Sequence, residues 1–276
     1  MPRADVASRR LQRLDAELVR RGLARSRDQA GELIASARVY VRGVPATKAA
    51  TGVDQDTPLR VVADDGDPGY VSRGGHKLAG ALDQFAGLSI VGRRCLDAGA
   101  STGGFTDVLL REGAAHVVAV DVGYGQLSWS LRSDDRVEVL DRTNVRSLTP
   151  AQIGGKVDVT VADLSFISLL AVLPALSACT CDEGDLVPMV KPQFEVGRDR
   201  LPSGGVVRDP ELRVDAVVSV ASAAAGLGWD LAGVARSPLP GPSGNVEFFL
   251  WLRRGHHLGA TDADATAMIR RVAGEP

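Results

Sequence analysis

The sequence is poor in long hydrophobic runs. None of the apolar stretches in its 276 residues reaches about eighteen positions, so a transmembrane helix is not expected. The first five residues are polar and lack the apolar core of a secretory signal, and a cytoplasmic location is therefore expected. With 45% hydrophobic and 24% charged residues, the chain has the composition of a globular protein with room for one large and one small domain.

Cysteine and lysine are also scarce. The cysteines are odd in number and lack metal-ligand spacing, so neither a disulfide framework nor a metal site is expected. They are Cys95, Cys179 and Cys181. Only four of the 32 basic residues are lysines, namely Lys48, Lys77, Lys156 and Lys191. Lysine can lose its proton in a suitable environment and arginine cannot, so the position of each lysine is informative about chemistry.

The net charge of −2 conceals an uneven distribution of charge. Residues 1–63 contain 12 Arg and Lys against 7 Asp and Glu, whereas the remainder contains 20 against 27. A small basic head on an acidic body is typical of a polyanion-binding module attached to another function. Turn-forming residues follow the head, and we expect a head over 1–63, a linker over 64–71, a body over 72–254 and a tail over 255–276.

Hydrophobic spacing in the head predicts two helices and a few short strands. Residues 11–24 place three leucines on one helical face. Ser26 and Gln29 have the spacing of a capping box that opens a second helix. Alternating residues predict strands over 39–42 and 59–62. The positions expected to face the core of the head are Leu11, Leu14, Leu18, Ala30, Leu33, Ile34 and Ala37.

Arginines gather around the turn between these helices and the first strand. A basic surface of this kind can neutralise RNA phosphates without reading base sequence, although a solvated arginine-rich face is the simpler alternative. The residues are Arg20, Arg21, Arg25, Arg27, Arg38 and Arg42.

The order of short motifs over residues 11–63 resembles the S4 RNA-binding domain. The matching positions are Arg13-Leu14-Asp15, Ser26-Arg27, Val39-Tyr40-Val41-Arg42-Gly43 and Lys48. The resemblance implies a structured RNA as partner, above all ribosomal RNA. It adds Arg13 and Lys48 to the expected RNA-binding residues.

From residue 90 onward, strand-like and helix-like stretches alternate. Helical stretches such as 105–112 and 169–178 separate the early strands, which predicts a doubly wound α/β sheet with its ligand above the carboxyl ends of the strands. The last two strands are joined by the turn 238–244, so they are expected to pair as a hairpin with one strand antiparallel. The expected strands are 94–98, 116–122, 137–140, 157–162, 186–190, 231–234 and 246–252.

A glycine-rich loop from Asp97 to Thr106 follows the first strand of the body and permits close approach of a nucleotide-like ligand. Asp121, at the end of the next strand, is placed to accept hydrogen bonds from ribose hydroxyls. A dinucleotide fits poorly, because the spacing is not G-x-G-x-x-G and Asp97 would face a pyrophosphate. S-adenosylmethionine (SAM) is cationic, so we expect SAM rather than a nicotinamide cofactor or an empty scaffold. The loop residues expected to contact it are Asp97, Gly99, Ser101, Gly103, Gly104 and Phe105.

Four ionisable residues stand in positions that suggest chemistry. Strands four and five are adjacent in such a sheet, so Asp163 and Lys191, which end them, should converge beside the cofactor. Lys77 precedes the sheet, and Glu247 lies among apolar residues at the start of the final strand. Burial of that carboxylate without a partner would cost several kcal/mol. Each residue alone could form a structural ion pair, but two of four lysines at one rim favour a catalytic role.

The set Lys77, Asp163, Lys191 and Glu247 around the glycine-rich loop resembles the Lys-Asp-Lys-Glu set of FtsJ/RrmJ-type ribose 2′-O-methyltransferases. Together with the S4-like head, five strings extend the resemblance to the TlyA (hemolysin A-like) family over residues 11–253. The strings are 72–78, 97–106, 162–168, 190–196 and 238–248.

This resemblance implies a Rossmann-like SAM-dependent methyltransferase sheet with an antiparallel last strand, preceded by a small α+β S4-like domain. It implies 2′-O-methylation of cytidines in the 16S and 23S ribosomal RNAs of the two subunits. By position it implies SAM contacts at Gly103, Phe105, Asp121, Asp141 and Asp163. Tyr70 departs from the family pattern, which has tryptophan there, and this leaves any coupling role of the linker open.

A ribose 2′-hydroxyl is a poor nucleophile, so it must be held in line with the methyl–sulfur bond and lose its proton during transfer. Our hypothesis is that Lys191 removes that proton or only orients the hydroxyl, and that Asp163 orients Lys191. A lysine acts as a base only when its pKa falls well below about 10.4. Lys77 and Glu247 would position the ribose and balance charge.

Three other functions are alternatives. The body could be a noncatalytic scaffold of an RNA-binding or ribosome-assembly protein. The hemolysin label of the family suggests a cytolysin, but the expected lack of a secretory signal, a membrane span and a strongly amphipathic helix argues against it. A base methyltransferase is disfavoured, because Asp163-Leu164-Ser165-Phe166 lacks the Asn/Asp-Pro-Pro-aromatic motif. Residues 254–276 show no periodic pattern and are expected to be a partly disordered tail, in which His256 and His257 are solvated. We expect a monomer that acts on ribosomal RNA or ribosomal subunits, without a membrane partner.

Overall fold

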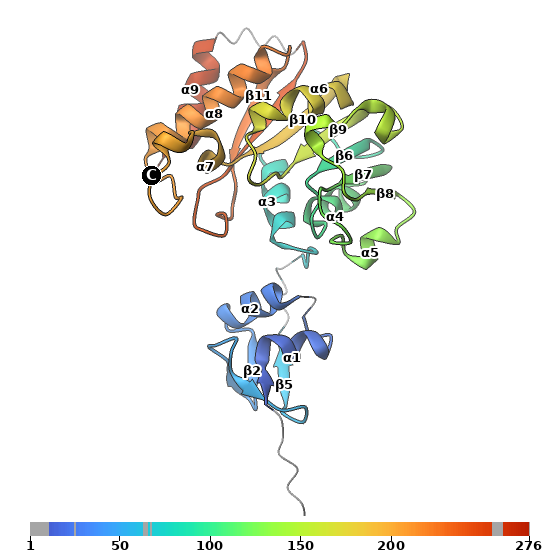
Figure 1. Cartoon of the computed structure of the whole chain (residues 1–276), viewed down its shortest axis with the longest axis vertical. Coiled ribbons are helices and arrows are strands. Elements are labelled where there is room, and N and C mark those ends of the chain that lie inside the picture. The colour runs from blue at the N-terminus through green and yellow to red at the C-terminus, as the bar shows by residue number, and fades with distance from the viewer. Residues whose placement is uncertain (1–10, 25, 63–65, 67, 256–261, 276) are drawn as a thin grey trace, which may run out of the picture. The chain divides into compact units, whose positions relative to one another are not determined.

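The computed structural model describes residues 11–24, 26–62, 66, 68–255 and 262–275, and the chain divides into two compact units, Met1–Gly69 and Tyr70–Pro276 (Figure 1). The first unit is a small α+β domain. Its elements are β1 (Gln12–Arg13), α1 (Leu14–Arg20), α2 (Arg27–Ala35), β2 (Val39–Val41), β3 (Val44–Pro45), β4 (Gly52–Val53) and β5 (Leu59–Val61).

Two short antiparallel sheets frame the helices of the first unit. β1 pairs with β4, and β2 lies between β3 and β5. The Ser26 hydroxyl accepts a hydrogen bond from the Gln29 backbone N–H at 3.1 Å, so α2 begins at the predicted capping position. The buried core contains Leu14, Leu18, Ala30, Leu33, Ile34 and Val39.

Two predicted core positions of the first unit are wrong. Leu11 is 66% exposed, because the backbone of the next two residues pairs with β4 and α1 begins only at Leu14. Ala37 is exposed as well, because α2 ends at Ala35 and Ala37 adopts a left-handed conformation with φ of 56°. In both cases the hydrophobic periodicity in the sequence extends beyond the end of the helix, before α1 at Leu11 and after α2 at Ala37.

The second unit is built on a seven-stranded sheet in the order β11-β12-β10-β9-β6-β7-β8. β12 runs antiparallel to both of its neighbours, and the other pairs are parallel. The predicted α/β class, hairpin and single antiparallel strand are thus confirmed. The strands are β6 (Arg94–Ala98), β7 (His116–Val120), β8 (Val137–Leu140), β9 (Val157–Ala162), β10 (Thr180–Val190), β11 (Asp230–Arg236) and β12 (Phe248–Arg253).

Helices cover both faces of this sheet (Figure 1). One core cluster joins the sheet to α3 (Arg73–Leu82), α4 (Gly104–Arg111) and the region of α5 (Trp129–Arg132). The other joins it to α6 (Leu173–Cys179), α8 (Pro210–Ala225) and α9 (Asp262–Ala273). The short α7 (Pro192–Glu195) follows β10 directly. The remaining turns are the 3₁₀ helices Val145–Ser147, Pro150–Ile153, Leu169–Ala171 and Arg198–Arg200.

The expectation of a tail without periodic structure is wrong for residues 262–273, which form α9. Ile269 and Ala273, one helical turn apart, are buried in the core cluster that contains α8. Arg270 pairs with Glu211 of α8 at 3.0 Å. The predicted tail histidines, His256 and His257, lie outside the described residues. Within the described residues, no helix is both long and apolar enough to cross a membrane.

Candidate active site

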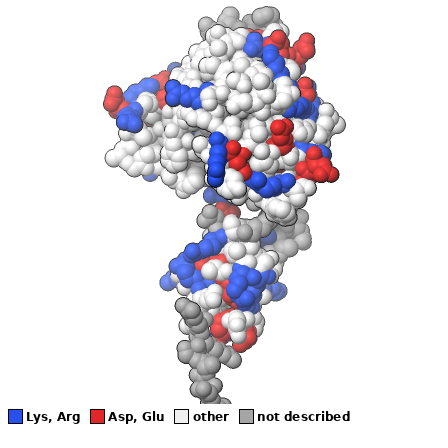
Figure 2. All heavy atoms as spheres, turned by 45° about the vertical axis from the view of Figure 1, so that its right-hand side comes forward, with Lys and Arg blue, Asp and Glu red and all other residues white. Residues whose placement is uncertain are grey.

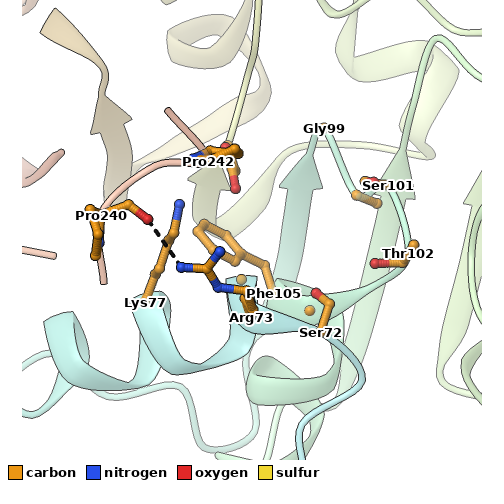
Figure 3. A pocket seen from close by; sticks show the side chains of 13 residues that line it. Ser72, Arg73, Lys77, Gly99, Ser101, Thr102, Phe105, Pro240 and Pro242 are labelled. Carbon is orange, nitrogen blue, oxygen red and sulfur yellow. Dashed lines mark hydrogen bonds between the residues drawn. The ribbon is translucent and has the colours of Figure 1, made fainter. Parts of the chain in front are cut away.

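A cavity opens where the carboxyl ends of β6 and β9 meet the first turns of α3 and α4 (Figure 3). Lys77 extends from α3 toward the turn that carries Pro240 and Pro242, and Phe105 lies beside it in the same cavity. Arg73 donates a hydrogen bond to the Pro240 carbonyl at 3.4 Å, which links α3 to that turn. Segments from both ends of the second unit therefore enclose one site.

Lys77 and Glu247 form the first buried ion pair at this cavity. Lys77 Nζ lies 2.5 Å from Glu247 Oε2, and the two side chains are 8% and 0% exposed. Glu247 stands immediately before β12, so the antiparallel strand returns its carboxylate to α3. The other carboxylate oxygen lies against Gly241, where an added Cβ would be 2.6 Å from it. The glycine thus allows the proline-rich turn to close over the pair.

Asp163 and Lys191 form the second pair. Lys191 Nζ lies 2.6 Å from Asp163 Oδ1 and donates a hydrogen bond to Ser165 Oγ at 2.9 Å. The two residues follow β9 and β10, which are neighbours in the sheet, so their convergence comes directly from the strand order. Asp163 lines the cavity and its side chain remains 23% exposed, whereas that of Lys191 is 9% exposed.

The glycine-rich loop forms the floor of the cavity. Gly99, Ser101, Gly104, Phe105 and Asp163 are among the residues that line it. Gly99 has φ of 90°, and a Cβ there would clash with the Asp163 carbonyl oxygen. A Cβ at Gly104 would clash with Ser72 Oγ at the start of α3. These glycines allow the loop to approach both neighbouring segments closely.

Asp97 lies beneath this loop, fully buried in β6. One carboxylate oxygen accepts a hydrogen bond from Thr106 Oγ1 at 2.6 Å. The other, Oδ1, has no hydrogen-bond partner among the described residues. Burial raises the pKa of the Asp97 carboxyl to about 7. A cationic group placed near the unpartnered oxygen would favour the ionised carboxylate.

Asp121 and Asp141 follow β7 and β8 and hold the loops beside the cavity. Asp121 accepts backbone hydrogen bonds from Ser101 at 2.8 Å and from Gly123 at 2.7 Å, and thereby fixes the glycine-rich loop. Asp141 pairs with Arg132 at 2.5 Å, and the hydrogen bond from Arg132 lowers the pKa of this carboxyl. Gly103, with φ of 101°, precedes α4 and packs against Leu127 and Leu131. All three residues act on the shape of the loop in this structure.

Sequence reasoning missed several residues of the site, among them Phe166, Phe194 and Glu195 in the segments that follow Asp163 and Lys191. Phe166 is 93% exposed and has φ of 64°, and its ring lies 5.5 Å from that of Phe194. Glu195 of α7 accepts hydrogen bonds from Ser168 Oγ at 2.6 Å and from the Leu169 N–H at 2.9 Å. Glu195 therefore ties the helix after Lys191 to the loop that carries Asp163. An acid four residues after the lysine is the only sequence signal for this contact.

The predicted RNA-binding residues of the first unit are distributed unequally between solvent and intramolecular contacts (Figure 2). The Arg13, Arg20 and Arg27 side chains are 52%, 53% and 60% exposed. Arg38 donates to the Val62 carbonyl, Arg42 lies 3.5 Å from Thr57 Oγ1, and Lys48 is exposed. Arg21 is only 21% exposed. Arg25 lies outside the described residues.

Two family models match the chain. The model described as FtsJ-like methyltransferase matches residues 70–254, and the S4 domain model matches residues 12–57. The chain belongs to the FtsJ-like methyltransferase family. The hairpin, the cavity and most of the two core clusters of the second unit lie in the FtsJ-like part, whereas α9, with its buried Ile269 and Ala273, lies beyond residue 254. The arginine-rich unit corresponds to the S4 domain.

Proteins from several bacteria match most of the chain. The 16S/23S rRNA (cytidine-2′-O)-methyltransferase TlyA of Mycobacterium tuberculosis is 65% identical over 87% of this chain and 89% of its own length. Hemolysin A of Brachyspira hyodysenteriae is 36% identical over 86% and 97%. A solved structure from Streptococcus thermophilus, named provisionally as a hemolysin, is 35% identical with a TM-score of 0.73 and covers 96% of this chain and 97% of its own.

Proposed function

We propose that this FtsJ-like protein is a SAM-dependent methyltransferase that methylates the ribose 2′-oxygen of cytidines in 16S and 23S ribosomal RNA. The observation that carries the proposal is the arrangement of two lysine–carboxylate pairs, Lys77–Glu247 and Asp163–Lys191, each of which has one member, Lys77 or Asp163, in the lining of one cavity. The identity of 65% to a relative named for this reaction supports the same conclusion.

The residues around the glycine-rich loop fit SAM. Asp97 offers a buried carboxylate oxygen without a partner among the residues described, which suits a ligand ammonium. Gly99 and Gly104 allow close approach of the backbone, and Asp121 holds the loop beside them. When bound, SAM supplies a methyl group on a sulfonium. The described side chains contain no group of three His, Cys, Asp or Glu residues that could hold a metal ion.

The two ion pairs would have different roles toward the ribose, one in controlling the hydroxyl proton and the other in holding the sugar. Asp163 lines the cavity and holds Lys191 Nζ at 2.6 Å, so this lysine is the candidate to receive or orient the proton of the 2′-hydroxyl. Lys77 lines the same cavity and would hold the ribose, while Glu247 fixes Lys77. In the transfer, the 2′-oxygen would form a bond to the methyl carbon as the methyl–sulfur bond breaks and its electron pair stays on the sulfur. The hydroxyl proton would pass to Lys191 or, where Lys191 only orients the hydroxyl, to water.

The cysteines disfavour the cysteine-dependent form of base methylation. None of the three cysteines is among the residues that line the cavity, and burial raises the pKa of Cys95, Cys179 and Cys181, which disfavours the thiolate that such a nucleophile requires. The exposed Phe166 beside Asp163 instead offers a ring on which an RNA base can stack. These features support an oxygen of the sugar as acceptor.

The decisive test is transfer of tritiated methyl from SAM to ribosomal subunits by the purified chain, followed by mass-spectrometric mapping of ribose methylation. We expect methylated cytidines in both ribosomal RNAs. SAM binding without transfer to either subunit would favour the noncatalytic assembly role. Methylation at a base atom would overturn the choice of acceptor while leaving the cofactor assignment intact.

A further inference from the structure

Two buried acids lie on α1 beneath the arginines of the S4 domain. Asp15 and Glu17 have side chains that are only 7% and 1% exposed. Positions two apart in a helix point to different sides, so each acid serves a separate arginine pair. Arg13 donates to both oxygens of Asp15 at 3.1 and 2.9 Å, and Arg27 of α2 donates to the same carboxylate at 3.0 Å.

The pair held by Glu17 differs from the pair held by Asp15. Arg20 donates to both Glu17 oxygens at 2.7 Å, and Arg21 Nε donates at 2.7 Å as well. The remaining nitrogens of Arg21 donate to the carbonyls of Asp54, Gln55 and Thr57 at 2.7–2.9 Å. Arg21 therefore fastens α1 to the turn before β5, and its guanidinium is committed to the fold.

In the pair held by Asp15 both arginine side chains are exposed, whereas in the pair held by Glu17 the Arg20 side chain is 53% exposed and the Arg21 side chain only 21%. Arg13 and Arg27 are 52% and 60% exposed, although the carboxylate between them is buried. The hydrogen bond from Arg13 lowers the pKa of Asp15, so the carboxylate is ionised throughout the physiological range. Two long, flexible side chains, one from β1 and one from α2, are thus held side by side before any ligand arrives.

We propose that Asp15 is a positioning residue for RNA: its buried carboxylate holds Arg13 and Arg27 as an ordered pair that binds phosphate. The inference rests on the proposed function only in taking ribosomal RNA as ligand. Ordering a long side chain on binding lowers affinity, and a carboxylate that has already ordered two of them removes part of this loss. A guanidinium fork engaged on one edge keeps further N–H donors for a phosphate.

For the substitution Asp15→Asn, this proposal and simple electrostatics predict opposite changes in RNA affinity. Asp15→Asn removes a negative charge from beneath an RNA-binding face, so charge alone predicts tighter binding. Loss of the ordered pair predicts weaker binding despite the added positive charge. We expect the affinity of the full chain for transcribed 16S ribosomal RNA to fall about fivefold to tenfold. Equal or tighter binding by D15N would overturn the inference.

Two controls separate positioning from loss of structure. Asp56→Asn removes an exposed acid from the same domain and is expected to leave affinity unchanged or raise it slightly. In a background of Arg13→Gln with Arg27→Gln, Asp15→Asn should change RNA affinity by less than about twofold, because its partners are gone. A full effect of D15N in that background would show a structural role instead.

Failure of the proposed function and failure of the proposed role of Asp15 would give different results. A wild-type chain that binds no ribosomal RNA at any salt concentration would remove the ligand itself, whereas intact wild-type binding with an unaltered D15N variant would remove only the role of Asp15. SAM binding by the same preparations reports that the FtsJ-like unit is folded in each variant.

Discussion

Two buried carboxylates, one in each unit of this protein, have opposite surroundings. In the S4 domain, Glu17 is buried under two arginines, and the hydrogen bond from Arg20 lowers its pKa to about 2. In the FtsJ-like unit, Asp97 is buried with only a hydroxyl as side-chain donor among the described residues, and burial raises its pKa to about 7. A buried acid that is paired with arginines of the protein holds those arginines in place at the surface. A buried acid without such a partner is suited to a positively charged ligand.

The same contrast applies to the basic residues. The arginines of the Asp15 pair are about half exposed, but Lys77, which lines the cavity, and Lys191, which pairs with the cavity residue Asp163, are 8% and 9% exposed. Exposed guanidiniums are suited to phosphates, and buried amines are suited to positions where a proton or a hydroxyl must be controlled. Four substitutions test this comparison.

The largest effect is expected from substitution of Lys191. Lys191→Ala removes the amine that Asp163 and Ser165 hold at the cavity, and we expect methyl transfer to ribosomal subunits to fall roughly a thousandfold or more. Lys156→Ala is the matched control, since this lysine is 44% exposed and pairs with Asp182 at 3.5 Å. Single-turnover transfer is the measurement, with SAM binding as the check on folding. A wild-type rate for K191A would remove Lys191 from the mechanism.

Asp97 offers a test through pH. Its pKa in the folded protein, about 7, lies above its ordinary 3.8, so the native state retains a proton that the unfolded chain releases. The favourable contribution of this protonated carboxyl to the free energy of unfolding is complete below about pH 4 and is lost as the pH rises through 7. Asp97→Asn should gain stability relative to the wild type over this range, by about 4 kcal/mol at most.

Urea unfolding at several pH values measures this difference in the free energy of unfolding. The exposed Asp83→Asn in the same unit serves as the control, for which a much smaller change with pH is expected. If the curves for D97N and the wild type run parallel from pH 4 to 7.5, Asp97 is ionised in the folded protein before any ligand binds.

Glu195 extends the comparison to a partly buried acid whose hydrogen bonds position neighbouring residues. Glu195→Ala releases Ser168 and Leu169, and thereby the loop that carries Asp163 and Phe166. We expect kcat to fall about 10- to 100-fold with little change in SAM affinity. Glu195→Gln, which can still accept a hydrogen bond, should recover much of the rate. The exposed Asp199→Ala is the nearby control, and equal rates for E195A and D199A would contradict the role.

Arg21 gives the smallest expected effect. Arg21→Gln should lower the stability of the S4 domain by about 1–3 kcal/mol, because three backbone carbonyls lose a charged donor. The salt dependence of RNA binding should stay close to that of the wild type. Arg13→Gln should do the reverse and reduce that salt dependence. If R21Q reduces the salt slope as much as R13Q, Arg21 contacts RNA as first expected from the sequence.

Much of the second unit was predictable because its strands are short, apolar runs with clear ends. The bounds of β6, β8 and β9 coincide with the predicted ones, and the hairpin of β11 and β12 follows from the turn between them. α9 was missed because its buried positions, Ile269 and Ala273, are few and its other faces are polar. A helix of this kind is stabilised mainly by the surface on which it packs, and the sequence does not display that surface.

The sequence alone determined the residue types at the cavity and was enough to predict that the fourth and fifth strands are neighbours and that the last two form a hairpin. Local pattern places Asp163 and Lys191 at strand ends, and strand order then makes them neighbours. What only the tertiary structure decided is which cations face which acids: that Lys77 meets Glu247 across 170 residues, and that Arg21 is part of the fold whereas Arg13 faces solvent. The reason is physical, because ion pairing depends on burial and distance, and both are fixed only when distant segments pack together.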